Sequence, residues 1–197
     1  INSNDADIYN NLGMIYVAKK EYTKAIGYFQ KAISINKNHL FANLNLGGLA
    51  LSHRDYNYAY QIFKELAFKY PSHEEIQLAL GYSLEGMKQL DASIAQFKSI
   101  LKMNEKSDLA VYKLCFVYQR KNSVNDALEY CQKYADMFGS CLKSDDKIFQ
   151  AISFLKQVKE SDAAEKAQPK TPENPEIPKS DVTDNKAPSS PTSAIEK

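Results

Sequence analysis

The sequence predicts an all-helical protein built as a stack of helical hairpins, because several residue types recur every 34 positions. Four sets of positions keep this period without an insertion: Leu12, Leu46, Leu80 and Leu114; Gly13, Gly47, Gly81 and Cys115; Ala25, Ala59, Ser93 and Ala127; Phe29, Phe63, Phe97 and Cys131. Leu12 and Tyr16 lie four residues apart, as do Ala25 and Phe29, so each pair shares one face of a helix. Small residues let the two helices of a unit pack closely, and each unit must stack on its neighbour to bury its apolar face.

This 34-residue pattern resembles the tetratricopeptide repeat, whose unit is a helix–turn–helix. The resemblance covers residues 6–141 as four repeats, at 6–39, 40–73, 74–107 and 108–141. It implies a right-handed superhelix in which the first helix of each repeat lines a concave groove. The family binds other proteins in such grooves, so the resemblance implies a non-catalytic scaffold or adaptor.

The fourth repeat departs furthest from the pattern. Cys115 stands at the glycine position, Cys131 at the aromatic position, and Tyr134 at a small-residue position of the second helix. A lost phenylalanine and a gained tyrosine conserve volume, so we expect the unit to be kept. The terminal repeats of such stacks usually depart from the repeat pattern.

Further elements are expected at both ends of the repeats. Residues 1–4 match residues 35–38 at the same offset, so we interpret residues 1–5 as the end of a truncated upstream repeat. Residues 142–160 are expected to form a capping helix, because Ile148, Ile152 and Leu155 make one apolar stripe. The alternative is an isolated amphipathic helix that binds a membrane or a partner.

Residues 161–197 have a different composition. They hold six of the seven prolines in the chain and no aromatic residue or glycine. Such a segment buries too little apolar surface to offset its ordering entropy, so a disordered tail is predicted. Pro172, Pro175 and Pro178 are spaced as in a polyproline turn, which leaves open a proline-recognising partner beside a simple spacer.

The charge balance argues against nucleic acid as the main partner. Residues 1–160 carry 20 Lys or Arg against 17 acidic residues, a net of +3, and residues 161–197 carry 5 against 7, a net of −2. Neither part has the basic surface that phosphate neutralisation requires. The chain has no run of about 18 apolar residues, so the sequence predicts no membrane-spanning helix. The compartment stays open between the cytoplasm and the bacterial periplasm or cell envelope.

Few residues suggest catalysis. His39 and His73 fall at the same repeat position, at the unit junctions, and are expected to be solvated turn residues. No glycine-rich phosphate loop is present. We therefore expect no enzyme activity, no cofactor and no metal site.

The three cysteines lie in or beside the last repeat, without metal-site spacing. Antiparallel helices would place Cys115 and Cys131 at similar heights, which allows a disulfide, and Cys131 with Cys141 is a second pairing. The favoured expectation is that the thiols stay free and pack as small apolar residues.

The resemblance assigns the groove to residues on the first helix of each repeat. These are Asn10, Asn11, Met14 and Val17; Phe41, Leu44, Asn45 and Leu51; Leu78, Tyr82 and Glu85; and Leu109, Tyr112, Phe116 and Arg120. Many are large and apolar, as expected for an interaction surface. At the positions where some relatives clamp acidic chaperone tails, this chain has Asn10, Met14, Asn45, Glu75 and Ala79, and only Asn45 suits that role.

We therefore expect an apolar or amphipathic protein segment as the ligand. Assembly of a larger envelope, pilus or secretion complex is one setting for such a scaffold. Two alternatives remain: a regulatory or substrate-recruiting segment of a larger enzyme, and a module that forms homo-oligomers.

Overall fold

The structure, a computed structural model, describes residues 5–139, 143 and 146–167. The described residues form nine α-helices joined by turns, with no strand among them. Their bounds are α1 (Ala6–Ala18), α2 (Tyr22–Ile35), α3 (Leu40–Ser52), α4 (Tyr56–Lys69), α5 (Glu74–Gly86), α6 (Leu90–Met103), α7 (Asp108–Arg120), α8 (Val124–Phe138) and α9 (Lys147–Ala167).

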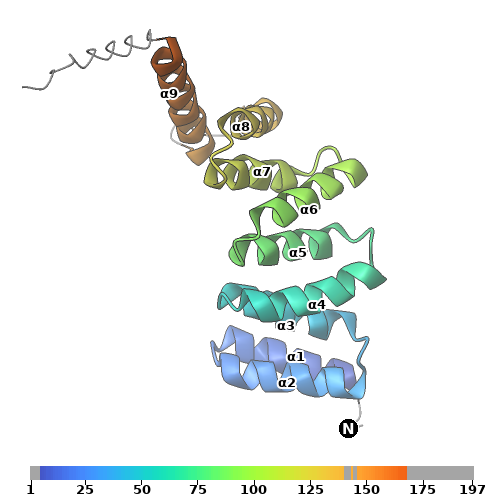
Figure 1. Ribbon diagram of the computed structural model, residues 1–197. Helices are drawn as coiled ribbons and strands as arrows, with labels where there is room; N and C mark the ends of the chain where they lie inside the picture. Colours follow the sequence, from blue (N-terminus) through green and yellow to red (C-terminus); the bar gives the residue numbers. More distant parts are fainter. Residues whose placement is uncertain (1–4, 140–142, 144–145, 168–197) are drawn as a thin grey trace, which may run out of the picture.

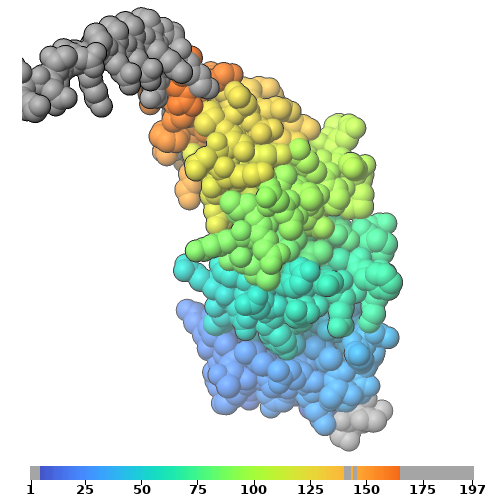
Figure 2. Space-filling view, in the orientation of Figure 1, coloured from blue at the N-terminus to red at the C-terminus, as the bar shows by residue number. Residues whose placement is uncertain are grey.

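Helices α1 to α8 make four hairpins, and each helix packs mainly on the helices before and after it in the chain. The hairpins stack into one elongated body, from the first hairpin at the bottom of Figure 1 to α9 at the top. The space-filling view in Figure 2 shows the same order of units as continuous bands. This arrangement confirms the predicted all-helical repeat fold.

Within three hairpins, a phenylalanine of the second helix lies against a glycine of the first. Phe63 and Phe97 are at most 2% exposed. A Cβ atom built on Gly47 would lie 2.7 Å from Cζ of Phe63, and one on Gly81 would lie 2.6 Å from Cε1 of Phe97. Phe29 meets Gly13 in the same way. Any side chain at these glycines would therefore push the ring out of the hairpin.

The hairpin turns also repeat in backbone conformation. Lys20, Arg54, Lys88 and Asn122 are 34 residues apart, and they adopt φ values of 61°, 62°, 62° and 59°. In each turn the backbone N–H of this residue donates to the carbonyl three residues before it, as from Arg54 to Leu51 at 3.0 Å. A left-handed residue ends the first helix, which reverses the chain direction.

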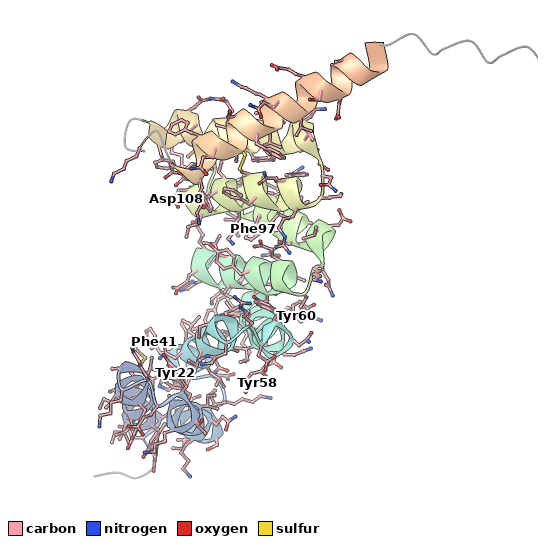
Figure 3. All side chains as sticks on the ribbon, turned by 90° about the vertical axis from the view of Figure 1, so that its left-hand side faces the viewer. Tyr22, Phe41, Tyr58, Tyr60, Phe97 and Asp108 are labelled. Atoms are coloured by element: carbon pink, nitrogen blue, oxygen red, sulfur yellow. A yellow bond between two sulfur atoms is a disulfide. The ribbon has the colours of Figure 1, made fainter. Side chains whose placement is uncertain are left out.

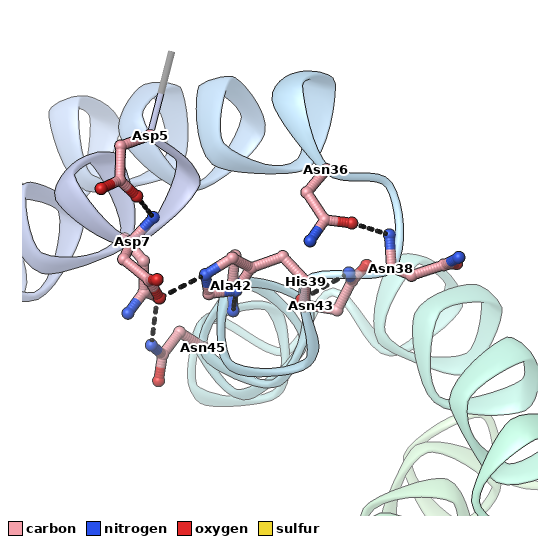
Figure 4. A network of polar contacts seen from close by, with 9 residues as sticks. Asp5, Asp7, Asn36, Asn38, His39, Ala42, Asn43 and Asn45 are labelled. Atoms are coloured by element: carbon pink, nitrogen blue, oxygen red, sulfur yellow. Dashed lines mark hydrogen bonds and ion pairs between the residues drawn. The ribbon is translucent and has the colours of Figure 1, made fainter. Parts of the chain in front are cut away.

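The residues that cap the first helix of each unit also recur at one position of the repeat, at the junction between units. His39 is 7% exposed, and its Nδ1 atom accepts the backbone N–H of Ala42 at 3.1 Å. Its Nε2 atom lies 2.9 Å from Oδ1 of Asp7, which ties the second unit to the first (Figure 4). The expectation that His39 is a solvated turn residue is therefore wrong, since the ring is a buried cap. His53 is exposed.

The fourth hairpin differs in its interior. Cys115 and Cys131 form a disulfide with a Cα–Cα distance of 4.8 Å, and both residues are fully buried. The favoured expectation of free thiols is wrong for this pair. The pairing of Cys131 with Cys141 is excluded by the bond to Cys115, and Cys141 itself lies outside the described residues.

Helix α9 covers the end of the stack. Ile148, Ile152 and Leu155 are at most 7% exposed and join the core of the fourth unit, so α9 is a cap rather than an isolated helix. The cap is longer than the predicted 142–160, because α9 continues to Ala167. Residues 161–167 are thus helical, which corrects their assignment to the disordered tail. The expected tail beyond 167 and residues 1–4 lie outside the described residues.

One N-cap side chain makes no hydrogen bond to the helix that it precedes. Asp5 and Ser107 each accept a backbone N–H of the helix that they precede, as His39 does. His73, at the equivalent position before α5, makes no such bond, and its Nδ1 atom is buried without a partner. A buried polar atom without a hydrogen bond lowers stability.

The change His73→Ser should raise the free energy of unfolding by about 0.5–1 kcal/mol, because serine is a preferred N-cap and leaves no orphaned ring nitrogen. Chemical denaturation measures this change. The matched control is Ser107→Ala, which should lower the free energy of unfolding by about 1 kcal/mol. A destabilised His73→Ser variant would contradict the assignment of this position.

Candidate functional site

Two adjoining hollows lie along the first helices of the units. The upstream hollow has a volume of about 510 Å³ and is lined mainly by α1 and α3. The downstream hollow, of about 710 Å³, is lined mainly by α3, α5 and α7. Gly48 and Ser52 line both, so the hollows meet at α3. We refer to the two together as the groove.

The upstream hollow is largely apolar. Met14, Phe41 and Leu44 line it, and Phe41 is 64% exposed and Met14 is 46% exposed. In Figure 3, Phe41 is labelled on the left of the second unit, whereas Tyr60 of α4 is labelled on the right. Asn45 also lines this hollow and donates from Nδ2 to Oδ1 of Asn10 at 2.9 Å. An apolar side chain of a ligand would find contacts here that the fold itself does not use.

The downstream hollow is charged. Glu85 on α5 is bonded by two cations from α7: Lys113 Nζ lies 3.1 Å from Oε2, and Arg120 Nη1 lies 2.8 Å from Oε1. The Lys113 ammonium also lies 4.5 Å from the ring centroid of Tyr82. The Glu85 side chain is 14% exposed and that of Arg120 is 47% exposed, so the cation faces the solvent more than the carboxylate does.

The charges in the downstream hollow do not balance. Lys88, Lys113 and Arg120 line it together with a single acidic residue, Glu85. Burial raises the pKa of the Tyr82 hydroxyl, and the carboxylates of Glu85 and Asp108 add to this rise, so the ring stays neutral. The hollow therefore carries an excess of positive charge on its wall, which favours an acidic group of a ligand.

The structure separates the predicted groove residues into two groups. Nine of them line the hollows: Met14, Val17, Phe41, Leu44, Asn45, Leu51, Tyr82, Glu85 and Arg120. Of the others, Leu78 is 6% exposed and packs in the core with Ile94 and Phe97, which corrects its assignment to the surface. Asn10 is 8% exposed and serves Asn45 as a hydrogen-bond acceptor.

The remaining predicted residues lie outside both hollows. Asn11 is exposed on α1, and Leu109 on α7 is 46% exposed. Tyr112 and Phe116 are half-buried against the core of the fourth unit, with ring centroids 4.8 Å apart. Tyr112 also packs edge-on against Tyr134 of α8 at 5.3 Å, so truncating these rings would disturb the fold as well as the surface.

Sequence reasoning missed several residues that shape the groove. Gly48 occupies the position held by Met14, Tyr82 and Phe116 in the other units, and its missing side chain opens the space between the hollows. Lys88 and Lys113 supply charge that the prediction omitted. The detectable signal was Gly48 itself, because a glycine replaces a large residue at an equivalent position.

Two further properties concern the described residues alone. None of the helices in this part of the chain is both long and apolar enough to cross a membrane. The same residues contain no cluster of three or more His, Cys, Asp or Glu side chains suited to a metal ion.

Comparison with known proteins gives one family and two curated relatives. The tetratricopeptide repeat family matches over residues 6–39. Protein O-mannosyl-transferase Tmtc3 of Drosophila melanogaster is 28% identical over 132 residues, which cover 65% of this chain and 14% of that protein. The TPR repeat-containing protein MJ1428 of Methanocaldococcus jannaschii is 25% identical over 154 residues, covering 69% and 27%. The chain thus spans a minor part of both relatives.

Solved structures share the fold. MamA superposes with a TM-score of 0.71 at 22% identity, covering 82% of this chain and 86% of that one. A tetratricopeptide repeat protein from Parabacteroides merdae superposes with a TM-score of 0.70 at 17% identity, covering 84% and 63%. The family match over the first unit, the four equivalent helical hairpins and the fold shared with these structures together support a tetratricopeptide repeat protein.

Proposed function

We propose that the groove holds an amphipathic segment of another protein, and that the chain acts as a non-catalytic scaffold or adaptor. Tetratricopeptide repeats form a family of protein-interaction modules, which gives the general function. The amphipathic character of the ligand follows from the two unlike halves of the groove. Catalysis is not part of this proposal, since the groove offers binding contacts rather than a reacting pair.

The observation that carries the proposal is the exposure of Phe41 and Met14 in a shared hollow. Phe41 is 64% exposed and Met14 is 46% exposed, so much of their apolar surface is left uncovered by the described residues. Exposed apolar side chains gathered in a concavity usually mark an interaction site. Burying them against a ligand would remove this surface from water.

The downstream half supports an acidic group on the same ligand. Its three cations face one carboxylate, and Arg120 keeps much of its side chain exposed while bonding Glu85. A ligand carboxylate could bond the free guanidinium edge without displacing Glu85. The ligand would then place apolar side chains over α1 and α3 and an acidic residue over α7.

A second candidate is a regulatory or recruiting segment within a larger enzyme. The similarity to Tmtc3, named as a transferase, favours it, since the chain covers only 14% of that protein. The groove would serve the same binding role in this setting, and the reaction would belong to another domain.

The double change Met14→Ala with Phe41→Ala should weaken binding of groove ligands about tenfold or more, because both side chains would contact the ligand. Peptides selected from a random library on the wild-type protein provide the probe, and calorimetry measures their affinity. Both residues are exposed, so helicity should be retained. The matched control is Phe68→Ala on α4, which is 89% exposed and lines neither hollow. Equal effects of the two variants would refute the proposed site.

The change Arg120→Gln should weaken the same peptides about three- to tenfold at low salt when they carry an acidic residue. The difference should shrink in about 1 M salt, where charge interactions are screened. Lys64→Gln on α4 is the control, since Lys64 lines neither hollow. Selected peptides that lack acidic residues, or an Arg120→Gln effect independent of salt, would contradict the charged half of the proposal.

A further inference from the structure

The fourth unit replaces a packing contact by a covalent bond at the same two positions. Cys115 and Cys131 stand 34 residues after Gly81 and Phe97, and their sulfur atoms are bonded. We propose that this disulfide is a redox-sensitive latch: with the bond intact the fourth hairpin and the cap α9 are held together, and reduction loosens both while the first two units stay folded.

The latch follows from what the phenylalanine does elsewhere. Phe97 is fully buried between α5 and α6, in contact with the position of Gly81. A cysteine at the aromatic position presents far fewer atoms, so α7 and α8 lack the ring contact that joins the two helices of the first three hairpins, although Tyr118 still stacks on Tyr130. The aromatic rings that the unit gains, at Tyr112 and Tyr134, are only partly buried and lie at the margin of the core. The disulfide therefore joins α7 to α8 at the place where a phenylalanine ring joins the two helices of the other hairpins.

The cap depends on the hairpin that the bond holds. Cys115 and Cys131 belong to one buried cluster with Ile148, Ile152 and Leu155 of α9. Helix α9 packs on α8, and no later hairpin supports it within the described residues. In a stack, each unit is stabilised by its neighbours. A loosened fourth hairpin therefore destabilises α9 before it affects the other units.

The chemical step is a two-electron reduction by a dithiol. One thiolate of the reductant attacks a sulfur of the disulfide and releases the other as a thiolate. The second thiol then closes a disulfide within the reductant, and the protein is left with two thiols after proton uptake. Because Cys115 and Cys131 are fully buried, attack requires local opening of the hairpin. A stable hairpin thus protects the bond that stabilises it.

A matched variant separates the redox effect from simple loss of packing. Cys115→Gly combined with Cys131→Phe rebuilds the pair found in the first three units and cannot form the disulfide. Should that variant fold poorly, wild-type protein in its two redox states still gives the comparison. Alkylation after denaturation checks the states, since the oxidised protein should take up two fewer labels than the reduced protein.

Hydrogen exchange followed by mass spectrometry, on the full chain with and without dithiothreitol, tests the latch. Reduction should speed exchange in α7, α8 and α9 on the order of tenfold to a hundredfold, as expected for losing a short closed loop. Exchange in α1 to α4 should stay unchanged, and the variant with Cys115→Gly and Cys131→Phe should not respond to the reductant. Unchanged exchange in the reduced wild type, an equal rise in every unit, or alkylation showing no disulfide would each overturn the proposal.

Discussion

The structure depends on the close contact between a phenylalanine of one helix and a glycine of its partner. At Gly47 and Gly81 no side chain fits, because the rings of Phe63 and Phe97 occupy the space where a Cβ would lie. This contact limits how near the two helices of a hairpin come, and it recurs in the first three hairpins. The groove lies along the first helices of these hairpins, so its wall depends on how the hairpins stack.

Much of the fold could be predicted because periodicity reports packing directly. The period of 34 residues, the hairpins and the apolar stripe of the cap each follow from residues that must be buried. The end of α9 could not be predicted from the composition change at residue 161, because residues 161–167 contain three alanines and continue the helix. The burial of His39 depended on a partner, Asp7, that lies 32 residues earlier in the chain.

The groove was less predictable, because exposure depends on neighbouring units. Leu78 and Phe41 were both expected on the inner wall, yet Leu78 is 6% exposed and Phe41 is 64% exposed. Leu78 belongs to a buried cluster that includes residues of the fourth unit, so its burial depends on a neighbouring unit and not on its own helix alone. The disulfide was geometrically foreseeable from Cys115 and Cys131, but spacing alone cannot distinguish bonded from free thiols.

A double-mutant cycle at Gly47 and Phe63 tests the central contact most directly. Gly47→Ala should strongly destabilise the protein, whereas Gly27→Ala, with no atom near its Cβ position, should stabilise it by about 0.5–1 kcal/mol through helix propensity. Phe63→Leu removes the ring atoms that the new Cβ would meet, so the double variant should be more stable than the sum of the single changes predicts. We expect a coupling free energy of about 1–3 kcal/mol from denaturation, and additivity within about 0.5 kcal/mol would contradict the account.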